Sequence, residues 1–278
     1  MRPDAQTTAA KTATVFFDID GTLGWVDPTC EEGRPRWEQG LSPAPNDAVV
    51  DAVRRLVRHG HRAFVCTGRP PGAIHPLITA MPFSGFITLA GAYVTLGSRI
   101  LRNEPIDPEL LRAVDDVLAR RGEGARLEGL RVVTELRGGT QGDSANSAPD
   151  INEALRRQPD GRVYKVILPT AAADEIMAEP RLAESLSAHA LELGNSEIGL
   201  ASNTKRAGLL AIAKVLRDGM GPTYGFGDAE NDLPILDEMT VAVAMGNAVD
   251  AVRERADYVT SDVAHDGVVA GLEHFGLI

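Results

Sequence analysis

The sequence predicts an α/β fold, in which a doubly wound parallel sheet of the Rossmann-like type is interrupted by an inserted α+β segment. Three observations predict it. Short apolar runs recur along the chain, helical patterns of apolar residues separate them, and the middle third of the chain breaks this alternation. The length of 278 residues suffices for one large domain or two modest ones, at roughly 150 residues per domain.

Five short apolar runs predict strands that are buried on both faces, as in a parallel sheet covered by helices. They are residues 14–17, 63–66, 85–89, 223–226 and 241–244. Between the first two runs, apolar residues of 46–59 recur at helical spacing, with Pro45 before them and Gly60 after them. A similar pattern over 204–218 ends before Gly219. Together these patterns predict the βαβ units of a doubly wound sheet.

The middle third of the chain has a different pattern. It contains a hairpin-like start, a helix pattern near 108–120, strand patterns at 131–134 and 162–168, and a loop at 137–147. Because this mixed segment interrupts the alternation of strands and helices, we predict that residues 94–190 form an inserted α+β cap domain. Residues 1–93 and 191–278 are then predicted to form one α/β core.

Composition and charge argue against several classes of protein. Hydrophobic residues at 44% and charged residues at 24% are typical of a globular domain. The net charge of −11 makes a nucleic acid or an anionic membrane surface a poor partner. No run approaches the roughly 18 apolar residues of a membrane span, and the start of the chain lacks the apolar stretch of a signal peptide. We therefore expect a cytoplasmic protein without nucleic-acid or membrane partners. For the assembly, a monomer and a homodimer both stay open.

Two aspartates, Asp18 and Asp20, follow the first predicted strand directly, and Gly21 allows a sharp turn after them. The carboxyl ends of strands are where open α/β sheets bind their ligands. A pair of carboxylates at this edge can divide the work of catalysis, one attacking as a nucleophile and the other transferring a proton. Taken alone, the pair could equally be a solvated strand end with a turn glycine.

A second acidic group, Asp228 and Asp232, follows a later predicted strand, with Asn231 beside it. If all the strands are parallel, these carboxylates and those of Asp18 and Asp20 meet at one edge of the sheet. Four carboxylates in one pocket repel each other, so a divalent cation is the simplest neutraliser. Oxygen ligands of this kind suit Mg²⁺.

Three further residues could hold a phosphate group. Thr67 and Gly68 follow the second predicted strand, where a hydroxyl and free backbone N–H groups can bind phosphate oxygens. Lys205 opens a predicted helix and supplies the point charge that a phosphoryl group requires. Taken singly, Thr67-Gly68-Arg69 is more often an ordinary turn, and Lys205 a solvated lysine.

In this order the motifs resemble those of the haloacid dehalogenase (HAD) superfamily. Four segments carry the resemblance, namely Asp18-Ile-Asp-Gly-Thr-Leu23, Thr67-Gly68-Arg69, Lys205 and Gly227-Asp-Ala-Glu-Asn-Asp232. The runs 243–248, 256–260 and 266–268 resemble the tail of the Cof-type (IIB) branch of this superfamily. In that branch an α+β cap domain is inserted between the second and third motifs, where residues 94–190 lie here.

The resemblance implies a Mg²⁺-dependent phosphatase that works through an aspartyl-phosphate on small phosphorylated metabolites, sugar phosphates being the leading class. By position, Asp18 is the implied nucleophile and Asp20 the implied general acid and base. The implied metal ligands are Asp18, the backbone carbonyl of Asp20, Asp228, and Asp232, which would orient the shell of the metal. The implied phosphate-binding residues are Thr67, Gly68, Lys205 and Asn231.

Three features depart from the family pattern. Arg206 follows Lys205, where many relatives carry Gly. Ala90-Gly91-Ala92 stands where many Cof-type sequences have Asn-Gly-Ala, so any contact of that Asn side chain is lost. The connection over 24–45 looks longer than usual and holds both tryptophans, Trp25 and Trp37. These tryptophans could form a lid over the site or simply pin the loop to the core.

Two other functions remain open at this point. A phosphomutase of the same superfamily would return the phosphoryl group to a rotated intermediate instead of transferring it to water. A non-catalytic module would use the same fold to bind a phosphorylated ligand or a protein. The complete set argues against the second of these, since a retired enzyme has no need of both Asp18 and Asp20. The set is Asp18, Asp20, Thr67, Lys205, Asp228 and Asp232.

Overall fold

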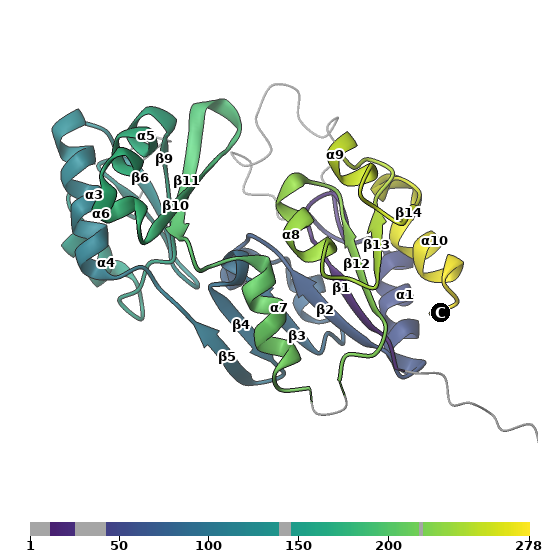
Figure 1. Ribbon diagram of the computed structural model, residues 1–278. Coiled ribbons are helices and arrows are strands. Elements are labelled where there is room, and N and C mark those ends of the chain that lie inside the picture. The colour runs from purple at the N-terminus through teal and green to yellow at the C-terminus, as the bar shows by residue number, and fades with distance from the viewer. Residues whose placement is uncertain (1–11, 26–42, 139–145, 217–218) are drawn as a thin grey trace, which may run out of the picture. The chain divides into compact units, whose positions relative to one another are not determined.

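The computed structural model describes residues 12–25, 43–138, 146–216 and 219–278 (Figure 1). The chain divides into two compact units. The first unit contains Met1–Val65, Leu77–Gly85 and Ala213–Ile278, and the second contains Cys66–Pro76 and Phe86–Ile212. The domain boundaries predicted from the sequence, 1–93 with 191–278 and 94–190, stay a prediction.

The first unit is built on parallel strands in the order β14-β13-β12-β1-β2. Their bounds are β1 Thr14–Phe17, β2 Arg62–Cys66, β12 Thr223–Gly227, β13 Val241–Ala244 and β14 Tyr258–Val259. All four residues of β1 are buried, as expected for a central strand that is covered on both faces. The parallel order confirms the predicted fold class for this part of the chain.

The first unit has five α-helices among the described residues, and α1 begins at a side-chain cap. Their bounds are α1 Asp47–Arg58, α2 Pro76–Thr79, α8 Leu233–Leu236, α9 Asp250–Arg253 and α10 Gly267–His274. The Asn46 side chain caps α1 by accepting a hydrogen bond from the backbone N–H of Val49 at 2.9 Å. The apolar stripe of α1 is buried, with α10 packed beside α1 (Figure 1). No helix among the described ranges is both long and apolar enough to cross a membrane.

The register of β1 against β12 positions the strand ends of the first unit. Phe17 pairs with Phe226, and the backbone N–H of Asp18 donates to the carbonyl of Phe226 at 3.1 Å. Aromatic packing holds this register, since the rings of Phe17 and Phe226 lie 5.1 Å apart. Chain segments that are distant in sequence therefore end side by side, which is where doubly wound sheets place their ligands.

The second unit contains strands β3 to β5 and a separate six-stranded sheet in the order β10-β11-β9-β6-β7-β8. Neighbouring strands of the six-stranded sheet run antiparallel, except β7 and β8. The strands are β3 Gly85–Thr88, β4 Tyr93–Leu96, β5 Arg99–Asn103, β6 Ala125–Glu128, β7 Val133–Leu136, β8 Ser147–Ala148, β9 Lys165–Pro169, β10 Leu186–Ala190 and β11 Asn195–Leu200. The helices are α3 Pro108–Arg121, α4 Ile151–Arg157, α5 Thr170–Ala178, α6 Pro180–Ala183 and α7 Lys205–Ala213. This antiparallel sheet with its helices matches the α+β character predicted for the middle of the chain.

The two faces of the six-stranded sheet differ in chemistry. Leu127, Val166 and Ile198 point to one face, where they join the apolar core formed with helices α3 to α6. Because side chains alternate along a strand, their neighbours Lys165 and Glu197 belong to the other face. This second face is polar, although Lys165 is only 8% exposed.

Two local predictions need correction. The strand predicted at 131–134 is observed as β7, two residues further along the chain, because its pairing with β6 fixes the register there. The predicted helix over 204–218 ends at Ala213, and its buried face includes Gly208. A Cβ on Gly208 would lie 2.5 Å from the side chain of Ile87, so a glycine at this position allows α7 to pack closely. Most of the predicted loop of 137–147 lies outside the described residues, and so does Trp37.

Candidate active site

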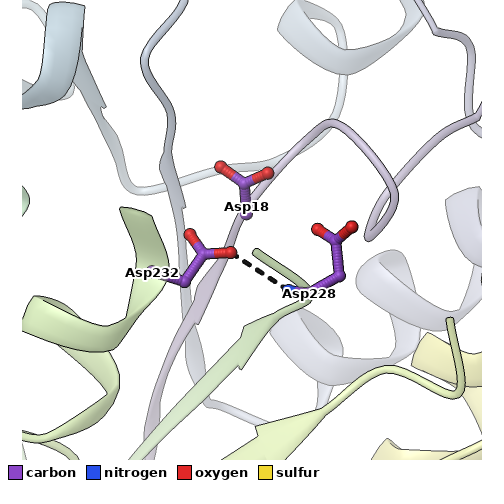
Figure 2. Close-up of side chains that lie close together, drawn as sticks. All are labelled: Asp18, Asp228 and Asp232. Atoms are coloured by element: carbon purple, nitrogen blue, oxygen red, sulfur yellow. Dashed lines mark hydrogen bonds between the residues drawn. The ribbon is translucent and has the colours of Figure 1, made fainter. Parts of the chain in front are cut away.

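Three aspartates of the first unit form an acidic cluster, which we define as Asp18, Asp228 and Asp232 (Figure 2). One carboxylate oxygen from each lies within 4.8 Å of the others. Asp18 and Asp232 are buried, and Asp228 is half-buried. The structure therefore brings together three of the four predicted metal ligands, from the ends of β1 and β12 and from the short turn after β12.

A tight turn after β12 holds Asp232 against the end of the strand. The Asp232 side chain accepts hydrogen bonds from the backbone N–H groups of Asp228 and Ala229, at 3.0 and 3.2 Å (Figure 2 draws the first). A Cβ on Gly227 would lie 2.6 Å from Asp232 Oδ2, so a side chain at position 227 would displace this carboxylate. Gly227 and Asp232 of the fourth motif are therefore coupled by packing.

Two side chains from elsewhere in the first unit position Asp228. The Thr22 hydroxyl donates to Asp228 Oδ1 at 3.5 Å, and Asn247 Nδ2 lies 3.4 Å from Asp228 Oδ2. Asn247 Nδ2 also donates to the Gly21 carbonyl at 2.9 Å, while its Oδ1 accepts from the N–H of Val263 at 2.9 Å. Asn247 thus ties the turn after β1 to the end of β12.

The sequence interpretation gave no role to Asn247 or Thr22. The only signal for Asn247 is its place in the family-like run 243–248, and Thr22 lies inside the first motif. Neither position is marked by charge or spacing, because a positioning side chain acts through hydrogen bonds that only the fold creates.

The turn after β1 contains Asp20, which is not one of the three carboxylates of the acidic cluster. Asp20 is exposed, and the turn closes through hydrogen bonds from Gly21 N to Gly24 O at 2.9 Å and from Gly24 N to Ile19 O at 3.0 Å. Gly21 has a φ of +76°, and a Cβ there would collide with Asp228 Oδ2. Only glycine allows both this backbone conformation and the close approach of the Asp228 carboxylate.

The donor chemistry of the acidic cluster fits a divalent cation. Three carboxylates this close together repel each other, and burial of two of them reduces screening by water. All the available ligand atoms are hard oxygens, which Mg²⁺ prefers over sulfur or nitrogen. A cation bound here would relieve the repulsion that the fold itself creates.

The predicted phosphate-binding residues are divided between the two units. Thr67 and Gly68 directly follow β2 and belong to the second unit, and the Thr67 Oγ1 accepts from the N–H of Arg69 at 3.2 Å. Lys205 begins α7 in the same unit and is 3% exposed, so it is not the solvated lysine that its position alone would suggest. Asn231 lies in the first unit and is exposed. Their joint role in phosphate binding stays a prediction.

Ala90, which stands where the family pattern has Asn, has an unusual backbone conformation. Ala90 has a φ of +53°, in the left-handed region that Asn enters more readily than other non-glycine residues. Its N–H donates to the carbonyl of Thr67 at 3.1 Å. The family Asn at this position therefore has a conformational advantage that Ala90 lacks.

Comparisons with known proteins agree on one family and one fold. The family model for haloacid dehalogenase-like hydrolases matches residues 15–272. The chain is 24% identical to "Putative phosphatase YkrA" of Bacillus subtilis (strain 168), over 95% of this chain and 98% of that protein.

Two solved structures share the fold. BT1666 from Bacteroides thetaiotaomicron, described among HAD phosphatases, superposes with a TM-score of 0.77 at 24% identity and covers 98% of each chain. BT4131, described as a HAD subclass IIB sugar phosphatase, gives a TM-score of 0.71 at 22% identity, over 96% of this chain and 100% of that one. At these identities the two structures establish the fold, a Rossmann-like core with a cap domain.

Proposed function

The chain belongs to the haloacid dehalogenase-like hydrolase family, as a phosphatase, and from this premise we propose that it hydrolyses small phosphorylated metabolites with the help of Mg²⁺. The observation that carries the proposal is the acidic cluster, whose carboxylates gather at the ends of adjacent parallel strands. Sugar phosphates are the leading substrate class, in keeping with the description of BT4131 as a sugar phosphatase.

In the proposed first step, a carboxylate oxygen of Asp18 attacks phosphorus. An O–P bond forms to Asp18 while the bond from phosphorus to the leaving oxygen breaks, and Asp20 gives its proton to that oxygen. The product is an aspartyl-phosphate and a free alcohol. The exposure of Asp20 supports this role, because its carboxyl group has to exchange protons with solvent between turnovers.

In the proposed second step, Asp20 acts as a general base and removes a proton from a water molecule. The water oxygen attacks phosphorus, the bond to Asp18 breaks, and inorganic phosphate leaves with Asp18 regenerated. Asp20 then holds the proton that the next cycle requires, so the two steps balance without a further acid or base.

Asp18, the backbone carbonyl of Asp20, Asp228 and Asp232 would hold the cation. When bound, it supplies positive charge that reduces the repulsion between a carboxylate nucleophile and an anionic phosphate. Thr67, Gly68, Lys205 and Asn231 would bind the phosphoryl oxygens, with Lys205 contributing the charge and the others hydrogen bonds. Hydrolysis of a phosphate monoester is extremely slow without a catalyst, which explains why several charged groups are needed at one site.

The test is phosphate release from p-nitrophenyl phosphate and from a panel of sugar phosphates, with Mg²⁺ or with EDTA. We expect release of inorganic phosphate with Mg²⁺ and almost none with EDTA. A wild-type protein that is inert on the whole panel with Mg²⁺ would refute the proposal. Conversion of a hexose 1-phosphate into an isomeric sugar phosphate, without release of phosphate, would identify a phosphomutase instead.

A further inference from the structure

A buried lysine on the polar face of the six-stranded sheet has no place in the proposed reaction. Lys165 opens β9, and its strand partners bring two carboxylates to the same face. Glu128 on β6 lies directly opposite Lys165, and Glu197 on β11 lies diagonally across from it. We call these three residues the lysine cluster.

The contacts of Lys165 hold its ammonium group in one place. Its Nζ lies 2.6 Å from Glu197 Oε2 and 3.7 Å from Glu128 Oε2. Burial by itself lowers the pKa of Lys165, but the charges of Glu128 and Glu197 outweigh this effect and the pKa is raised overall. Lys165 is therefore a fixed cation at neutral pH.

A third contact connects the lysine cluster to the predicted phosphate-binding turn. Lys165 Nζ donates a hydrogen bond to the Gly68 carbonyl at 3.2 Å, within the second unit. Gly68 follows Thr67 in the turn whose N–H groups are proposed to bind the phosphoryl oxygens. A group recognised by Lys165 would therefore lie close to the phosphate, on the part of the substrate next to the ester bond.

A small pocket has Lys165 and Glu197 among its lining residues. It has a volume of about 30 Å³, and its polar lining comes from Tyr164, Lys165, Ser187, His189, Glu197 and Asn203. Since a single water needs at least about 10–15 Å³ measured in this way, the pocket holds about two water-sized groups. It fits a pair of hydroxyls rather than a complete sugar ring.

The lysine cluster also retains capacity for hydrogen bonds. An ammonium group has three N–H donors, and the contacts to Gly68 and Glu197 use two of them. The distance of 3.7 Å to Glu128 is longer than a hydrogen bond. Among the described residues, Glu197 has one ionic partner, Lys165, while a carboxylate can accept about four hydrogen bonds.

Building on the proposed phosphatase function, we propose that Lys165 and Glu197 recognise hydroxyl groups of the leaving alcohol next to the phosphoester. A hydroxyl both accepts and donates, so it can accept a hydrogen bond from Lys165 while donating one to Glu197. Recognition by charged partners of this kind is stronger than recognition by neutral ones. The pair thus selects polyol and sugar phosphates.

The same pair discriminates against leaving groups that carry a second negative charge. The charges of Lys165 and Glu197 offset each other, so the pocket offers no net positive charge to an anion. A substrate carboxylate cannot donate to Glu197 and is repelled by it at short range. Phosphorylated acids are therefore expected to be poorer substrates than phosphorylated polyols.

The experiment compares wild type with Glu197→Gln, which keeps the size of the side chain but removes its charge. Steady-state kinetics with Mg²⁺ are measured on p-nitrophenyl phosphate, on 3-phosphoglycerate, and on glucose 6-phosphate, ribose 5-phosphate and glycerol 3-phosphate. For the best polyol substrate, we expect Glu197→Gln to lower kcat/KM by at least about tenfold. The value for p-nitrophenyl phosphate, which has no hydroxyl group, should stay within about twofold of wild type.

Two further variants separate recognition from folding. Lys165→Met should lose the preference for polyol phosphates as well, while Lys214→Met, a matched change of an exposed lysine, should keep it. Glu197→Gln should also improve the relative rate on 3-phosphoglycerate, because the repelling charge is gone. A purely structural role would instead lower kcat/KM on all substrates by the same factor.

The outcomes distinguish this inference from the proposed function. If wild type hydrolyses p-nitrophenyl phosphate but none of the polyol phosphates, or if Glu197→Gln leaves the ratio between substrate classes unchanged, the hydroxyl-recognition site is refuted and the phosphatase assignment stands. If wild type hydrolyses no phosphate ester with Mg²⁺, the phosphatase proposal itself fails, and the inference fails with it.

Discussion

The acidic cluster and the lysine cluster solve the same electrostatic problem in different ways. In the first unit, three carboxylates lie within 4.8 Å of each other, and a bound cation would neutralise them. In the second unit, two carboxylates surround an ammonium group that belongs to the chain itself, with the nearest oxygen at 2.6 Å. One cluster is built to be completed by a ligand, whereas the other already contains its counter-charge.

The two clusters therefore suit different tasks: the acidic cluster suits binding of metal and phosphate, and the lysine cluster suits recognition of the leaving alcohol. A site that depends on an added cation can gain and lose charge as metal and phosphate bind. A site with a fixed internal ion pair keeps the same hydrogen-bonding groups whether or not metal is present. We therefore expect metal-dependent behaviour from the acidic cluster and metal-independent behaviour from the lysine cluster.

The largest expected effect is the loss of activity in Asp18→Asn. An amide cannot form the aspartyl-phosphate, so kcat on p-nitrophenyl phosphate should fall by about 10⁴-fold or more. Circular dichroism should show an unchanged fold, and the exposed Asp51→Asn should retain full activity. Substantial activity in Asp18→Asn would remove the nucleophile from the acidic cluster and with it the proposed mechanism.

The next largest effect concerns the stability that the lysine cluster gives to the folded chain. Lys165→Met leaves Glu128 and Glu197 without their buried cation and should lower the free energy of unfolding by about 3 kcal/mol. Urea denaturation measures this cost, with Lys214→Met as the matched control. An unchanged midpoint would mean that the ion pairs of Lys165 contribute nothing to the fold.

The stability that Lys165 contributes depends on pH, because the pKa of Lys165 is raised in the folded chain. Because the folded chain binds this proton more tightly than the unfolded chain, the stabilisation is fully present below the ordinary pKa of 10.5. It is lost as the pH rises through the raised pKa. The difference in unfolding free energy between wild type and Lys165→Met should be constant from about pH 7 to 9 and shrink above about pH 10.

A smaller effect is expected from metal binding. At a Mg²⁺ concentration about 100-fold above the dissociation constant, the folded state gains about 2.7 kcal/mol, which thermal denaturation detects as a rise in Tm. Asp228→Asn should lose most of this shift, and Lys165→Met should keep it. Equal shifts in both variants would show that the cation binds elsewhere.

The smallest effect should come from the positioning residue Asn247. Asn247→Ala removes the hydrogen bonds to the Gly21 carbonyl and to Asp228, so the half-saturating Mg²⁺ concentration for activity should rise by about tenfold. The exposed Asn152→Ala, a matched change in the second unit, should leave it unchanged. A loss of kcat without any change in Mg²⁺ dependence would assign Asn247 a different role.

Much of the candidate site was accessible from the sequence because strand ends can be recognised locally. The apolar run of β1 marks where Asp18 must lie, and the run of β12 marks Asp228 in the same way. Parallel pairing of these strands then suffices to predict that the two carboxylates meet. Asn247 could not be found by this reasoning, since nothing local indicates that a loop asparagine reaches the Gly21 carbonyl.

The sequence by itself determined the fold class, the family and the residues of the acidic cluster. These depend on periodicity and on short motifs, which are properties of neighbouring residues. Only the tertiary structure shows that Lys165 is buried between two carboxylates, because its partners Glu128 and Glu197 lie on other strands. Strand register fixes which side chains share a face, and register is set by long-range pairing that no local pattern contains.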